Sequence, residues 1–216
     1  MGETAIQELV YIEIDQVTLE GALEIPPGAH GIVLFAHGSG SSRHSPRNNY
    51  VARILRRARL GTLLIDLLTE QEDAVYETRF DIDLLTQRLI AATKWLGKQP
   101  ESKDLRVGYF GASTGAAAAL KAAAKLGGHD VGAVVSRGGR PDLAEPNLEN
   151  VDSPTLLIVG GEDHGVIELN EFAYQKLHSL KQLALVPGAT HLFEEPGTLE
   201  EAARLATQWF NIHLHS

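Results

Sequence analysis

Three residues, Ser113, Asp163 and His191, have the types needed for nucleophilic catalysis. Ser113 lies in the pentapeptide Gly111-Ala-Ser-Thr-Gly115, which matches the G-x-S-x-G pattern of a nucleophile elbow. A serine becomes a nucleophile when a histidine takes its proton, and that histidine needs an acid to orient it. We therefore predict that Ser113 is the nucleophile, His191 the base and Asp163 the orienting acid.

The residues around Ser113 predict the strand-turn-helix context that such a serine requires. Residues 106–110 form an apolar stretch typical of a strand, and an alanine-rich helix is expected over 116–126. On so tight a turn the serine has strained backbone angles, and the strand and helix nearly touch beside it. We expect glycine at positions 111 and 115 because larger side chains there would collide.

The acid and the base are selected from their positions after predicted strands. His191 is one of nine histidines, and it lies in the loop between the last predicted strand and the last predicted helix. Asp163 follows a glycine pair at the end of the strand predicted over 155–159. The order Ser113, Asp163, His191 is the order found in α/β-hydrolases.

The hydrophobic pattern predicts an α/β protein. We expect strands over residues 8–15, 17–25, 31–36, 62–66, 106–110, 131–136, 155–159 and 183–186, and helices beginning at Asn48 or Asn49 and covering 81–98, 116–126, 167–179 and 199–213. The first two strands should form a hairpin. The other strands, alternating with helices, predict a mostly parallel sheet covered by helices on both faces. Ligands bind such sheets beyond the carboxyl ends of the strands.

Composition narrows the classes of partner and cofactor. A formal net charge of −9 disfavours a nucleic-acid or anionic-membrane binder, and the absence of cysteine excludes disulfides and thiolate metal sites. No run of about 18 apolar residues is present, and the first fifteen residues lack a signal-peptide pattern. We expect one cytoplasmic domain over residues 1–216, with no metal or cofactor.

The motifs together resemble the α/β-hydrolase superfamily, and within it the small, lid-less branch similar to dienelactone hydrolases. The resemblance rests on the segments H37-G-S-G, G111-A-S-T-G115, G160-G-E-D163 and A189-T-H191-L-F. It implies that the backbone N–H groups of Ser39 and Thr114 form the oxyanion hole. The dienelactone hydrolases proper use a cysteine nucleophile, so Ser113 favours an ordinary serine esterase acting on small esters or lactones.

Four arginines in loops expected near the serine suggest a substrate preference: Arg43, Arg47, Arg137 and Arg140. If they point inward, their charges would attract a carboxylate or phosphate on the substrate, and anionic esters should react faster than neutral ones. The alternative is that they pair with the acidic residues of 70–73 or reach into solvent. His164 either contacts substrate or is an exposed loop residue.

Three other functions are consistent with parts of the sequence. A protein of this fold can bind a ligand without turning it over, and an acyltransferase would use the same residues with an acceptor other than water. A dinucleotide-binding domain is suggested by Gly38-Ser39-Gly40 and by Asp66 at the end of the next strand. However, Arg43 replaces the third glycine of that fingerprint, and the following helix begins too late to contact a pyrophosphate.

Overall fold

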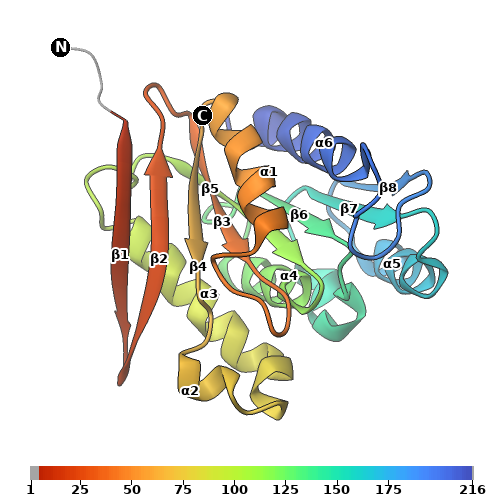
Figure 1. Ribbon diagram of the computed structural model, residues 1–216, viewed down its shortest axis with the longest axis horizontal. Helices are drawn as coiled ribbons and strands as arrows, with labels where there is room; N and C mark the ends of the chain where they lie inside the picture. The colour runs from red at the N-terminus through yellow and green to blue at the C-terminus, as the bar shows by residue number, and fades with distance from the viewer. Residues whose placement is uncertain (1–4, 216) are drawn as a thin grey trace.

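The computed structural model describes residues 5–215, which form an eight-stranded sheet with helices on both faces (Figure 1). The strands are β1 (Ile6–Ile14), β2 (Val17–Ile25), β3 (Gly31–Ala36), β4 (Leu60–Ile65), β5 (Arg106–Ala112), β6 (Ala133–Arg137), β7 (Thr155–Gly160) and β8 (Lys181–Val186). Their order in the sheet is β1-β2-β4-β3-β5-β6-β7-β8, and only the pairs β1–β2 and β2–β4 are antiparallel. The predicted fold class and hairpin are therefore confirmed.

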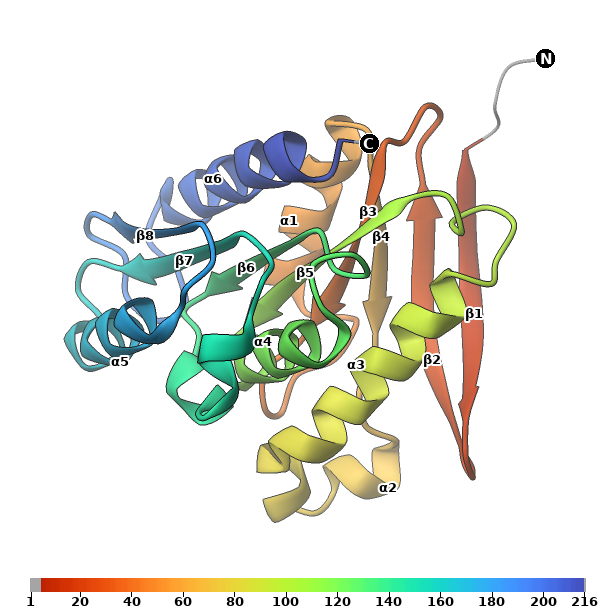
Figure 2. The ribbon, with the colours of Figure 1, turned by 180° about the vertical axis from the view of Figure 1, so that it is seen from behind.

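The helices cover the sheet in two layers. The helices are α1 (Pro46–Arg57), α2 (Glu70–Asp73), α3 (Ile82–Leu96), α4 (Thr114–Leu126), α5 (His164–Lys176) and α6 (Thr198–His213), with short 3-10 turns η1 (Glu77–Phe80), η2 (Pro141–Ala144) and η3 (Asn147–Asn150). Helices α1 and α6 pack on one face, and α3, α4 and α5 on the other (Figures 1 and 2). No lid domain is present in residues 5–215.

The core consists of two apolar clusters, one on each side of the sheet. In β3, Ile32 and Leu34 contribute to the cluster under α3 and α4, whereas Val33 and Phe35 contribute to the cluster under α1 and α6. Successive side chains of a strand point to opposite faces, so a continuous apolar run is required when both faces are covered. This explains why the central strands could be recognised from the sequence.

The structure corrects the predicted start of α1. Asn48 and Asn49 were expected to cap this helix, but Ser45 is its N-cap and accepts a hydrogen bond from the Asn48 N–H. Pro46 occupies the first helical position, where its missing N–H costs nothing. The helix therefore begins nearer to β3 than predicted, and its first turn lies close to the carboxyl end of that strand.

The strand order argues against the dinucleotide-binding alternative. When the six parallel strands β3 to β8 are numbered 1 to 6 along the chain, their order in the sheet is 2-1-3-4-5-6, whereas the classic dinucleotide-binding domain has the order 3-2-1-4-5-6. None of the helices in residues 5–215 combines the length and the apolar character needed to span a bilayer. The first fifteen residues, which lack a signal-peptide pattern, include residues 1–4, and these four lie outside the described residues.

Candidate active site

Ser113 lies on a strained turn between β5 and α4, as the sequence predicts. Its backbone angles are φ 52° and ψ −124°, a conformation that non-glycine residues rarely adopt. A Cβ on Gly115 would collide with the carbonyl oxygen of Ala36, and one on Gly111 would lie 2.5 Å from Ala116 Cα. The two glycines therefore allow β3, β5 and α4 to meet at the serine.

Asp163 and His191 are hydrogen-bonded to each other. His191 Nδ1 lies 2.7 Å from Asp163 Oδ2, and the aspartate side chain is 16% exposed. Asp163 lies between β7 and α5, and His191 lies in the loop after β8. A Cβ on Gly160 would collide with the carbonyl oxygen of Ala189, so this glycine lets the two loops approach closely. Because a carboxylate can only accept, the Nδ1 atom carries the proton and Nε2 is left to act as a base.

Glu195, which the sequence analysis did not single out, holds the loop of His191 in place. Its carboxylate accepts hydrogen bonds from the Thr190 N–H at 3.1 Å and from the Thr190 hydroxyl at 2.6 Å. These bonds fix the backbone immediately before His191. They also lower the pKa of Glu195, because both bonds favour the charged carboxylate.

Ser113 and His191 line the same cavity, whose volume is about 220 Å³. No direct hydrogen bond joins Ser113 Oγ to His191 among the described residues. Nucleophile–base hydrogen bonds often tighten only when substrate binds, so this geometry is compatible with a catalytic pair. The structure brings the three predicted residues together, and their catalytic roles stay predictions.

The two expected oxyanion donors differ in their resting partners. The Ser39 N–H donates a hydrogen bond to Thr114 Oγ1 at 2.9 Å. The Thr114 N–H, in the first residue of α4, has no acceptor within the part of the chain that is described. A Cβ on Gly38 would lie 3.0 Å from Ser113 Cβ, so the loop carrying Ser39 passes directly beside the nucleophile. The N–H of Thr114 is thus free in the described residues, whereas the N–H of Ser39 is bound to the Thr114 hydroxyl.

Arg137 and Arg47 line the cavity with Ser113. Arg137 ends β6 and is only 6% exposed, and this burial lowers the pKa of its guanidinium to about 10. The guanidinium lies 5.6 Å from the centre of the Phe193 ring, and its Nη2 is 3.4 Å from Asn48 Oδ1. Arg47, on the first turn of α1, has its Nη1 3.5 Å from the exposed Glu194 carboxylate. No pattern in the sequence predicts that Asn48 and Phe193 contact an arginine.

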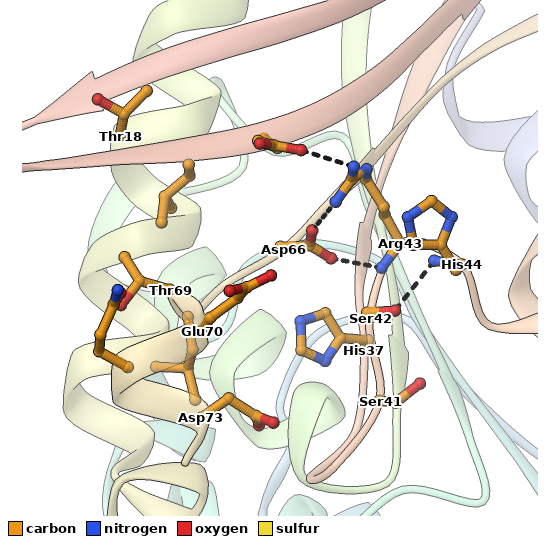
Figure 3. Close-up of a pocket in the computed structure, with 14 residues that line it drawn as sticks. Thr18, His37, Ser41, Ser42, Arg43, His44, Asp66, Thr69, Glu70 and Asp73 are labelled. Carbon is orange, nitrogen blue, oxygen red and sulfur yellow. Dashed lines mark hydrogen bonds and ion pairs between the residues drawn. The ribbon is translucent and has the colours of Figure 1, made fainter. Parts of the chain in front are cut away.

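Arg43 and Arg140 do not line the cavity with Ser113, and both form ion pairs, as the alternative to inward-facing arginines expects. Arg43 forms ion pairs with Asp66 and Glu20 (Figure 3). Arg140 forms two hydrogen bonds with Asp142 at 2.8 and 2.9 Å. The acidic partners are thus not those of residues 70–73 that the alternative named.

His164 lies on the surface of the protein. Its side chain is 80% exposed, it is the first residue of α5, and it lines neither the cavity beside Ser113 nor the one lined by His37 and Arg43. Its Nε2 lies 4.0 Å from Glu162 Oε2, at the limit of an ion pair. Of the two alternatives from the sequence, this placement matches the exposed loop residue.

A second cavity, of about 600 Å³, is lined by neither Ser113 nor His191 (Figure 3 shows the residues that line it). It is lined by His37, Arg43 and Asp66 and meets the smaller cavity only at Ser41. Two of its lining side chains have close partners: Arg43 binds Asp66, and His37 Nε2 accepts a hydrogen bond from the Leu67 N–H at 3.0 Å. Burial lowers the pKa of His37. We therefore regard His37 as a neutral structural residue that joins the loops after β3 and β4.

A metal site was not expected, and no group of three or more His, Cys, Asp or Glu side chains in residues 5–215 is placed to hold a metal ion.

Comparison with known proteins gives several matches. The family model described as the dienelactone hydrolase family matches residues 66–213. The crystal structure of a dienelactone hydrolase from Anabaena variabilis is 54% identical and superposes with a TM-score of 0.95, covering 99% of this chain and 100% of that one. Est1E from Butyrivibrio proteoclasticus has a TM-score of 0.82 at 15% identity over 95% of this chain and 98% of its own, which is a likeness of fold alone.

Curated relatives from two strains of Mycobacterium tuberculosis carry a different kind of name. They are 57% identical over 207 residues, which is 96% of this chain but 46% of theirs. Both bear the provisional name of a phosphoribosyl transferase. The chain thus spans about half the length of the curated relatives it matches.

Proposed function

The chain belongs to the dienelactone hydrolase family, and from this premise we propose that it is a serine hydrolase that cleaves small carboxylic esters or lactones. The observation that carries the proposal is the hydrogen bond of 2.7 Å between His191 Nδ1 and Asp163 Oδ2, in a loop that shares a cavity with the elbow serine. This bond fixes the imidazole tautomer in which Nε2 can take a proton from Ser113.

In the acylation half-reaction, Ser113 Oγ attacks the ester carbonyl carbon while its proton moves to His191 Nε2. The carbonyl oxygen becomes an oxyanion, which the N–H groups of Ser39 and Thr114 stabilise. The bond from the carbonyl carbon to the leaving oxygen then breaks, and His191 returns the proton to that oxygen. An alcohol leaves, and the acyl group remains on Ser113.

In the deacylation half-reaction, water takes the place of the alcohol. His191 Nε2 removes a proton from water as its oxygen attacks the acyl carbon, and the same proton then returns to Ser113 Oγ as the bond to the serine breaks. Asp163 keeps the imidazolium oriented and balances its charge in both steps. The products are a carboxylic acid and the free enzyme.

The size of the site supports small substrates. The cavity beside Ser113 measures about 220 Å³, below the range of about 300–1,000 Å³ that is usual for sites of drug-sized ligands. Leu192 at its edge is 39% exposed and offers an apolar contact to a short acyl or alkyl group. A serine in place of the family's cysteine nucleophile also favours esters over the dienelactone itself.

The transferase name of the curated relatives is compatible with this proposal. The chain matches less than half of each relative, so we attribute the named activity to the remainder of those proteins. The matched part corresponds to 96% of this chain, and a hydrolase activity is the function we assign to it.

Labelling with a fluorophosphonate tests the proposal. This probe reacts with activated serines, and peptide mass spectrometry locates the label. We expect labelling at Ser113 that the substitution Ser113→Ala abolishes, together with hydrolysis of p-nitrophenyl acetate. Folded protein that neither takes the label nor cleaves a panel of short esters would favour the non-catalytic alternative.

A further inference from the structure

Asn170, on α5, has a fully buried side chain that joins this helix to a distant loop. Its Nδ2 donates one hydrogen bond to the Val166 carbonyl oxygen of its own helix at 2.8 Å and one to the Gly139 carbonyl oxygen at 3.1 Å. Its Oδ1 has no hydrogen-bond partner in the part of the chain that is described. A buried polar atom without a partner costs stability, and asparagine is a weak helix former. Packing and helix stability alone therefore do not account for an amide at this position.

The loop that Asn170 contacts, segment 138–140, is bonded to the backbone of the proposed nucleophile. The Arg140 N–H donates a hydrogen bond to the Ser113 carbonyl oxygen at 3.0 Å, and the Ser113 N–H donates one to the Arg137 carbonyl oxygen at 3.4 Å. The serine is thus bound on both sides by the end of β6 and by the segment that follows it. Its positive φ of 52° is costly, and such a conformation persists only where the surroundings fix it. The position of segment 138–140 therefore affects the position of the Ser113 side chain.

The same segment lies against the proposed base. A Cβ on Gly138 would lie 3.1 Å from the His191 carbonyl oxygen and 3.7 Å from His191 Cε1, so the backbone of this glycine passes directly beside the imidazole. Two consecutive glycines leave a backbone unusually free, so this segment needs fixed points. The Gly138 N–H is bound to the Ile158 carbonyl oxygen at 2.8 Å, and the Gly139 carbonyl is bound to Asn170.

The helix that carries Asn170 begins at the proposed acid. Asp163 is the N-cap of α5, and its carbonyl oxygen accepts a hydrogen bond from the Ile167 N–H at 2.9 Å. The Val166 carbonyl, which accepts the other bond of the Asn170 amide, lies between Asp163 and Asn170 on the same helix. One buried amide therefore connects the helix of the acid to the segment that contacts both nucleophile and base.

We propose that Asn170 is a positioning residue whose amide fixes segment 138–140 against α5, and thereby keeps Ser113 and His191 in register for proton transfer. The inference rests on the proposed function and adds to it a residue outside the triad. Asn170 does not line the cavity beside Ser113, so it acts through segment 138–140 and not on the substrate.

The substitution Asn170→Leu tests this role, because leucine has a similar size and cannot form the hydrogen bonds. For p-nitrophenyl acetate we expect kcat to fall about tenfold to hundredfold, since a displacement of about 1 Å at the reacting atoms can cost about a hundredfold. KM should change less than about twofold, because the cavity that binds the ester keeps its lining. An unchanged kcat in Asn170→Leu, with wild type active, would overturn the inference.

Ala173→Gly is the matched control for a general loosening of α5. Ala173 is fully buried on the same helix, and glycine there weakens the helix without removing a side-chain hydrogen bond. This variant should lower the urea midpoint but leave kcat within about twofold of wild type. If kcat falls as far in Ala173→Gly as in Asn170→Leu, the effect is a loss of helix stability, and the positioning role is wrong.

Hydrogen exchange of the Arg140 amide, followed by NMR, tests the contact without turnover. In Asn170→Leu this amide should exchange about threefold to tenfold faster, the range for the loss of one neutral hydrogen bond, and in Ala173→Gly its rate should not change. Wild type that takes no fluorophosphonate label and cleaves no ester contradicts the proposed function, whereas faster Arg140 exchange in that case still supports the contact of Asn170 with segment 138–140. Unchanged exchange in Asn170→Leu contradicts the inference whether or not wild type is active.

Discussion

Replacing Thr114 by valine tests whether the resting oxyanion hole is occupied by the protein's own side chain. The Ser39 N–H donates to Thr114 Oγ1 at 2.9 Å, although the proposed reaction needs that N–H for the oxyanion. The hydrogen bond must therefore break when the tetrahedral intermediate forms. Valine keeps the shape of threonine but lacks the acceptor, so in this variant the Ser39 N–H is released.

The expected magnitude follows from the strength of one hydrogen bond. A neutral intramolecular hydrogen bond contributes about 0.5–1.5 kcal/mol over its replacement by water, and water can reach Ser39 because the residue is exposed. With RT near 0.6 kcal/mol, kcat/KM should rise about twofold to twelvefold when this bond no longer competes. The free energy of unfolding should fall by a similar amount, so stability and activity change in opposite directions.

The assay is hydrolysis of p-nitrophenyl acetate, combined with urea denaturation of the same preparations. Thr114→Ser is the control, because it retains the hydroxyl acceptor and should behave as wild type in both measurements. A fall in kcat/KM of tenfold or more in Thr114→Val would refute the reasoning. It would mean that the hydroxyl holds the Ser39 N–H in its catalytic position instead of competing for it.

Three further predictions follow from contacts in the structure. Asp163→Asn should lower kcat by about 10⁴, the loss known for the same change in a serine protease, because an amide no longer selects the correct His191 tautomer; an unchanged kcat in folded protein would exclude Asp163 as the orienting acid. Gly115→Ala should lower the free energy of unfolding by about 3 kcal/mol or more in urea denaturation, because its Cβ would collide with the carbonyl oxygen of Ala36; a loss under 1 kcal/mol would contradict this. Burial lowers the pKa of His37, so the unfolded chain binds its proton first and stability should fall as pH drops through about 6.5. The melting temperature of His37→Gln should depend less on pH between 5 and 7 than that of wild type, and parallel curves would count against the assignment.

The elbow, the N-terminal hairpin and a mostly parallel sheet covered on both faces could be predicted because local patterns indicate them. Continuous apolar runs identify strands that are covered on both faces, and glycine at positions 111 and 115 marks a turn where backbones nearly touch. The cap of α1 was misplaced for a local reason as well. Two asparagines are good caps, but a serine directly before Pro46 is favoured, since proline fits the first helical position.

The full set of arginine partners could not be predicted, because it depends on how distant elements pair. Arg43 meets Glu20 and Asp66 because β2 pairs with β4 in antiparallel register, with Gly21 opposite Ile65. No pattern near Arg43 in the sequence indicates that register. Likewise, the burial of Arg137 depends on the first turn of α1 and on Phe193 in the loop after β8.

Three features of the site cost stability without a structural return. Ser113 and Phe193 both have positive φ angles, of 52° and 55°, although neither is glycine. Arg137 lies 5.6 Å from the Phe193 ring and has no carboxylate partner in the described residues. The elbow motif predicts the strain at Ser113, whereas local rules of propensity and pairing predict neither the φ angle of Phe193 nor the unpaired Arg137. A chain selected for folding alone would replace each of them. Strain and an unpaired buried charge persist together where binding and chemistry require them, and here both occur at the cavity of about 220 Å³ that Ser113 shares with His191. The larger cavity of about 600 Å³ is lined by the closely paired Arg43 and Asp66. The backbone strain and the unpaired buried charge therefore indicate the position of the candidate site more precisely than cavity volume does.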